Sequence, residues 1–79
     1  MVIYHGGAII TPTVAPKGTA FEAGAKVSYE DGNEKSLGVL GHFASAQAAM
    51  RFAITSATAF VDGDPLPRPP VVLVEFSAR

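Results

Sequence analysis

The side chains best suited to metal binding or proton transfer in this 79-residue sequence are its two histidines, His5 and His42. His5 lies in a glycine-rich stretch near the N-terminus, and His42 lies just before an alanine-rich stretch, so a fold could bring them together. A metal site needs at least three protein ligands with supporting partners, and the sequence has no cysteine. His5 and His42 are therefore the candidate ligand residues, with two unrelated surface histidines as the simpler interpretation.

Two acidic residues, Asp62 and Asp64, flank Gly63. Paired carboxylates can serve acid–base chemistry or bind a hard cation. Without a third ligand, such a pair at a helix exit is more often a solvent-facing turn, and that is our expectation here.

Phosphate binding and nucleophilic catalysis find little support. Residues 38–42, GVLGH, lead from a predicted strand into a predicted helix, as phosphate loops do. Their glycine spacing matches neither dinucleotide nor Walker motifs, so a plain turn is expected. Ser36, Ser45 and Ser56 lack a nucleophile-elbow context and an evident His–Asp partner. The sequence therefore predicts no enzyme, no catalytic residue and no cofactor.

The charges are balanced and scattered, with six basic and seven acidic residues. Nucleic-acid binders carry a basic stripe that neutralises phosphates, so this class of partner is disfavoured. The first ten residues, MVIYHGGAII, lack a basic start, and no stretch is long enough to span a bilayer. A cytoplasmic protein with no membrane partner is the expectation.

The elements that would position these residues centre on one amphipathic helix. It is predicted over residues 45–61, with Ser45 as N-cap and Gly63 as the stop signal. Phe52 and Ile54 border its apolar face and widen the apolar arc to about 200°, more than one small sheet would cover. The predicted apolar face comprises Ala46, Ala49, Met50, Ala53, Ala57, Phe60 and Val61.

Strands are predicted before the helix. Residues 1–10 form a strand pattern interrupted at Gly6-Gly7 by a bulge or bend. Residues 11–18 read as a loop because they hold two prolines and a glycine. Residues 19–29 alternate between apolar and polar positions, as in a half-buried strand.

The next strand, residues 33–40, is predicted to form a hairpin with residues 19–29. A three-residue loop, ending with Gly32 in the left-handed conformation, sets Leu37 opposite Ala25 and Val39 opposite Ala23. A two-residue loop would put both apolar side chains on the polar face, so the first register is preferred.

After the helix, residues 62–70, DGDPLPRPP, predict an irregular linker with polyproline character. Its last four residues also fit a PxxP motif, which can dock on an aromatic groove. Residues 71–76, VVLVEF, have the length and composition of a strand. This strand would pair within its own sheet or cross to a neighbouring subunit.

The order of these signals is marked by Tyr4, Gly6, Pro12, the strand 21–29, Asp31, Gly32, Phe43, Ser45, Ala49, Val61, Asp62 and Gly63. This order resembles a group of short bacterial β-β-β-α domains, many of them uncharacterised, that includes proteins similar to HlyU-type regulators. The resemblance implies a regulatory domain associated with nucleic acid, and it implies no catalytic residue. The helix here departs from that group, because it is rich in alanine and Arg51 is its one charged residue.

Together these patterns predict a single α+β domain over residues 1–79. A three-stranded antiparallel sheet packs on one helix (about 45–61), and an additional C-terminal strand covers about 71–76. A core this small, without disulfides, is commonly stabilised by oligomerisation, so a homodimer through sheet edges or helix borders is expected. The predicted function is a non-catalytic interaction or regulatory domain; the alternatives are a nucleic-acid-associated regulator and a small-ligand or metal-binding protein. The interface candidates are Phe52, Ile54, Val72, Val74 and Phe76.

Overall fold

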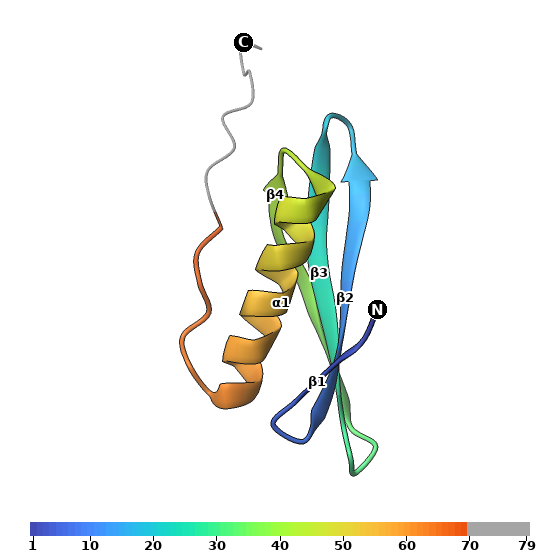
Figure 1. Cartoon of the computed structure of the whole chain (residues 1–79), viewed down its shortest axis with the longest axis vertical. Helices are drawn as coiled ribbons and strands as arrows, with labels where there is room; N and C mark the ends of the chain where they lie inside the picture. The colour runs from blue at the N-terminus through green and yellow to red at the C-terminus, as the bar shows by residue number, and fades with distance from the viewer. Residues whose placement is uncertain (70–79) are drawn as a thin grey trace.

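One antiparallel sheet and one helix make up residues 1–69, the part of the chain that the computed structural model describes. The strands follow one another in the order β1-β2-β3-β4, and α1 lies across one face of the sheet (Figure 1). The α+β class is therefore confirmed, and the predicted C-terminal strand lies outside the described residues. The elements are β1 (Ile3–His5), β2 (Ala8–Lys17), β3 (Ala20–Tyr29), β4 (Glu34–Phe43) and α1 (Ala46–Asp62).

The first prediction to fail is the single strand over residues 1–10. Gly6 and Gly7 do not form a bulge in one strand; they form the two-residue turn of a hairpin in which His5 pairs with Ala8. Both glycines have positive φ, 56° and 81°, as the tight turns that suit the strand twist require. The structure therefore has two strands where the sequence predicted one.

The predicted loop over residues 11–18 is also wrong, because β2 continues to Lys17 and pairs with β3 throughout. β1 covers β2 only as far as Ile10. Beyond Ile10, within residues 1–69, the other side of β2 is a free edge of the sheet. Pro12 and Pro16, opposite Ala25 and Phe21, lack a donor, and a missing donor costs nothing where no strand is paired.

β3 and β4 keep the predicted register only near their turn. Gly32 has φ 93°, and Val27 pairs with Lys35, as a three-residue loop requires. Register shifts then occur, so that Gly24, rather than Ala23, is opposite Val39. The predicted position of Val39 is wrong, because a shift by one residue moves a side chain to the other face of the sheet. β4 also runs to Phe43, three residues beyond its predicted end at residue 40.

The helix begins and ends as predicted. The Ser45 hydroxyl accepts a hydrogen bond from the Ala48 amide at 3.1 Å, and Gly63 caps the C-terminus in the left-handed conformation. Ala49, Ala53 and Ala57, spaced four residues apart, are fully buried against the sheet. Their small side chains let the helix backbone approach the strands closely.

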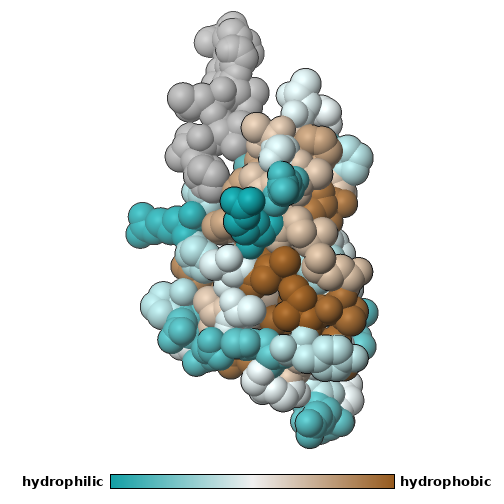
Figure 2. All heavy atoms as spheres, viewed as in Figure 1, coloured by the Kyte–Doolittle hydropathy of each residue, from teal (hydrophilic) through white to brown (hydrophobic). Residues whose placement is uncertain are grey.

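The core lies between α1 and one face of the sheet. In the C-terminal half of α1, Ala57 packs with Ile10 and Val27. Around Ala49 and Ala53, a second cluster includes Phe43. Leu37 packs against the first cluster, as predicted. Figure 2, drawn from the same direction as Figure 1, shows apolar residues at the surface right of centre, in the region where Figure 1 places the N-terminus.

Candidate functional site

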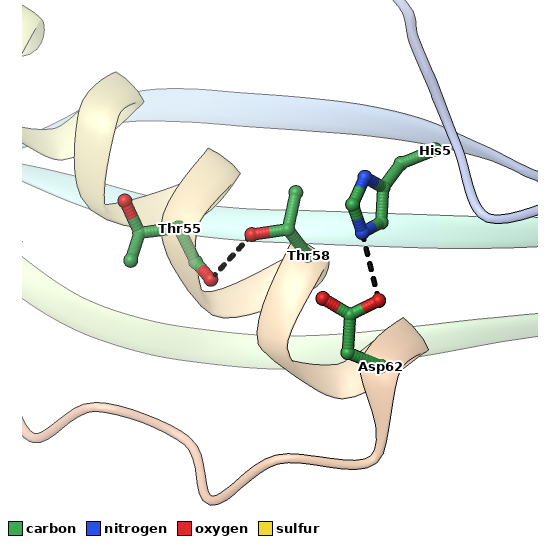
Figure 3. Close-up of polar contacts among 4 residues, drawn as sticks. All are labelled: His5, Thr55, Thr58 and Asp62. Carbon is green, nitrogen blue, oxygen red and sulfur yellow. Dashed lines mark hydrogen bonds and ion pairs between the residues drawn. The ribbon is translucent and has the colours of Figure 1, made fainter.

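His5 connects the first hairpin to the end of the helix. Its Nε2 atom lies 2.8 Å from the Oδ1 atom of Asp62, the last residue of α1 (Figure 3). Both side chains are partly exposed, so solvent screens the pair and its contribution to stability is small. Asp62, predicted as a turn former, is therefore the partner of His5. Asp62 and Asp64 are both exposed, as expected for a solvent-facing turn.

His42 lies on the opposite face of the sheet, close to the end of β4. It stands opposite Glu22, and its Nε2 atom is 3.2 Å from the Glu22 Oε2 atom. Glu22 in turn pairs with Ala15 on β2, whereas His5 pairs with Ala8. Ala8 and Ala15 are seven residues apart on β2, so the positions of His5 and His42 along the sheet differ by about 23 Å.

The two histidines therefore do not form a joint site, and the idea that they meet is wrong. Each has its own carboxylate partner on its own face of the sheet. Among residues 1–69, no group of three His, Cys, Asp or Glu side chains is arranged to hold a metal ion.

The residues considered for phosphate binding and nucleophilic catalysis belong to β4, to the N-cap of α1 and to α1 itself. Residues 38–42 lie inside β4 rather than in a strand-to-helix turn, so they do not form a phosphate loop. Ser45 caps the helix, and Ser36 accepts a weak hydrogen bond of 3.4 Å from the Gly38 amide. The Thr58 hydroxyl donates to the Thr55 carbonyl within α1 at 2.9 Å (Figure 3).

Ser56 is a polar residue that the sequence reasoning did not place in the core. It is 1% exposed, and its hydroxyl has no hydrogen-bond partner among the described residues. The signal for it was its spacing, because Ser56 lies three residues after Ala53 and so on the buried side of the helix.

What the structure does assemble is a hollow of about 270 Å³ on the outer face of the sheet, the face without the helix. Gly24 forms its floor: a Cβ atom there would lie 2.9 Å from the Thr13 hydroxyl and 3.2 Å from the Gly38 carbonyl. Glu22 and Lys26 stand at the two ends, four residues apart on β3, which is about 13 Å.

Large apolar side chains are exposed on the same outer face. Tyr4 is 76% exposed, Val39 is 60% exposed and Ile9 is 37% exposed. Tyr4 pairs with Ile9 at one end of the face, and Val39 borders the hollow. Because side chains alternate along a strand, these residues point away from the core that their neighbours fill.

The predicted interface residues on the helix are half-buried. The Phe52 ring lies 5.0 Å from the Phe43 ring, at an interplanar angle of 41°, and packs on the second core cluster. Ile54 is partly buried too. The other predicted interface residues, Val72, Val74 and Phe76, lie outside the described residues.

Within residues 1–69, α1 lacks the length and apolar character of a helix that crosses a membrane. Comparisons of the chain with protein-family models, with curated proteins and with solved structures find no match.

Proposed function

We propose that this chain is a non-catalytic interaction domain that associates with a second copy of itself through the outer face of its sheet. The observation that carries this proposal is the exposure of Tyr4, Ile9 and Val39 on a face that α1 does not cover. A sheet with one solvated face usually carries polar side chains there, so exposed large apolar residues favour a contact surface.

The charges on this face favour a protein partner over nucleic acid. Lys26 is 3.7 Å from Glu34, and Glu22 stands beside His42. Lys17, placed on the same face by the alternation along β2, and Lys26 are balanced by Glu22 and Glu34, so the face lacks the basic excess that replaces the counterions of a phosphate backbone. We therefore favour self-association over the alternative of a regulator that binds duplex DNA.

The test is the mass of the protein in solution, measured by size-exclusion chromatography with light scattering over a range of concentrations. We expect twice the chain mass of 8.2 kDa at high concentration. Val39→Asp should shift the protein to the monomer, because an unpaired carboxylate would be desolvated in the contact. The control is Gln47→Asp, a similar change at an exposed position on α1, which should leave the dimer intact.

Two outcomes would contradict the proposal in different ways. A monomer at every concentration in the unmodified protein would remove self-association altogether. A dimer that survives Val39→Asp as well as it survives Gln47→Asp would place the contact elsewhere on the molecule.

A further inference from the structure

A second hollow, of about 200 Å³, opens on the other side of the molecule between α1 and the end of β4. Its lining is mostly apolar and includes Phe43, Ala48 and Phe52, with Arg51 and Thr55 at the helix surface. Phe43 is a buried member of the second core cluster, and Ala48 and Phe52 pack against that cluster. The core is therefore open towards solvent at this point among the described residues.

The chain returns to this hollow after the helix ends. From Gly63 it turns back and runs beside α1 (Figure 1). Pro69, the last described residue, lies against Gly41 on β4: a Cβ atom added to Gly41 would be 2.6 Å from the Pro69 Cβ atom. The same added atom would be 3.1 Å from the Phe43 ring, so Pro69 lies at the rim of the hollow.

The segment between Gly63 and Pro69 has a restricted backbone. Proline restricts φ and favours an extended backbone, and residues 65, 67 and 69 are all proline. The segment that follows, residues 71–76, has the sequence VVLVEF and contains five apolar residues. At about 3.5 Å per residue, the chain can carry Val71 and Val72 at most about 7 and 11 Å from Pro69.

We infer that the hollow is the docking site for residues 71–76 of the same chain, which place an apolar side chain against Phe43 and Phe52. Burial of one such side chain removes apolar surface of both partners from water. The same chain is favoured over a second copy because Pro69 already lies at the rim. A tethered segment has an effective concentration in the millimolar range, far above that of a separate molecule in dilute solution.

This inference does not depend on the proposed function, which uses the outer face of the sheet. The first experiment is disulfide cross-linking, for which the absence of cysteine from the sequence provides a clean background. In the full chain, Ala48→Cys combined with Val72→Cys should form an intramolecular disulfide under mild oxidation. Disulfides need Cβ atoms about 3.8 Å apart, so the bond reports close approach.

The matched control combines Met50→Cys with Val72→Cys. Met50 is two residues from both Ala48 and Phe52, so at 100° per residue it lies on the far flank of the helix. We expect at least a fivefold lower yield of monomeric cross-link for this control. Equal yields would overturn the inference, and so would a cross-linked dimer in place of the monomer, which would assign the hollow to the segment of a second copy.

A stability measurement on single substitutions avoids the introduced thiols. Val72→Asp in the full chain should lower Tm by several degrees, because a charged side chain cannot stay in an apolar hollow. Ser77→Asp adds the same charge just beyond the segment and should leave Tm unchanged. If Val72→Asp changes Tm no more than Ser77→Asp does, the docking of this segment is refuted.

Discussion

The two faces of the sheet are built from the same strands, yet they differ in nearly every physical respect. On the face towards α1, Ile10 and Val27 are fully buried. On the outer face, Tyr4 is 76% exposed and Val39 is 60% exposed. The helix face is closely packed around its alanines and opens to solvent beside Phe43 and Phe52, whereas the outer face holds an open hollow above Gly24.

The difference indicates that the helix face determines the stability of the fold, whereas the outer face is available to bind a partner. A closed face is sensitive to any change in volume, because its neighbours have no room to adjust. An open face can change its side chains at little cost to the fold, so its apolar residues are free to serve a partner. The helix face should therefore respond to substitution through the free energy of unfolding, and the outer face through association.

The largest expected effect contrasts Ile10→Ala with Val39→Ala. Ile10→Ala removes buried methyl groups and leaves a cavity, which should lower the free energy of unfolding by about 2 to 5 kcal/mol. Val39→Ala should change it by less than about 0.5 kcal/mol in the dilute monomer. Urea unfolding followed by circular dichroism measures both. Similar losses for the two variants would contradict the distinction between the faces.

A smaller effect is expected from adding volume instead of removing it. Ala53→Leu places a larger side chain where α1 touches the sheet and should cost about 1 to 3 kcal/mol. Ala46→Leu, on the exposed first turn of the same helix, is the control and should be close to neutral. A tolerated Ala53→Leu, measured by the same unfolding experiment, would mean that the helix face is not closely packed.

The smallest expected effect is a gain. Ser56→Ala removes a buried hydroxyl that has no hydrogen-bond partner among the described residues. Because an unsatisfied buried polar group costs free energy, this substitution should raise the free energy of unfolding by about 1 kcal/mol. A loss of stability in thermal unfolding would show that the hydroxyl is hydrogen-bonded, for example to a water molecule. Gln47→Ala, at an exposed position on the same helix, controls for helix propensity.

Much of the fold could be predicted, since its signals act over a few residues. Ser45 caps the helix through a hydrogen bond three residues ahead, and Gly63 ends it through its own backbone conformation. The alternation of Ala23, Ala25 and Val27 identified the buried side of β3, and all three are buried. Such features depend on neighbours in the chain, so they can be read without the fold.

The candidate site was much less predictable, because it depends on residues that are distant in sequence. Whether prolines interrupt β2 depends on how far β1 covers its edge. The face on which Val39 lies depends on register shifts between β3 and β4. The partners of His5 and His42, Asp62 and Glu22, come from other elements altogether.

The sequence by itself therefore determined the α+β class, the helix with both of its ends and the alternation along β3. Only the tertiary structure decided which edge tolerates proline, which histidine meets which carboxylate, and which apolar side chains are left in solvent. The physical reason is the separation along the sequence of the residues that interact. Caps, turns and alternation follow from local hydrogen bonds and dihedral preferences. Strand pairing and helix docking, in contrast, set which of two equivalent faces is buried, and a shift of one residue reverses that choice.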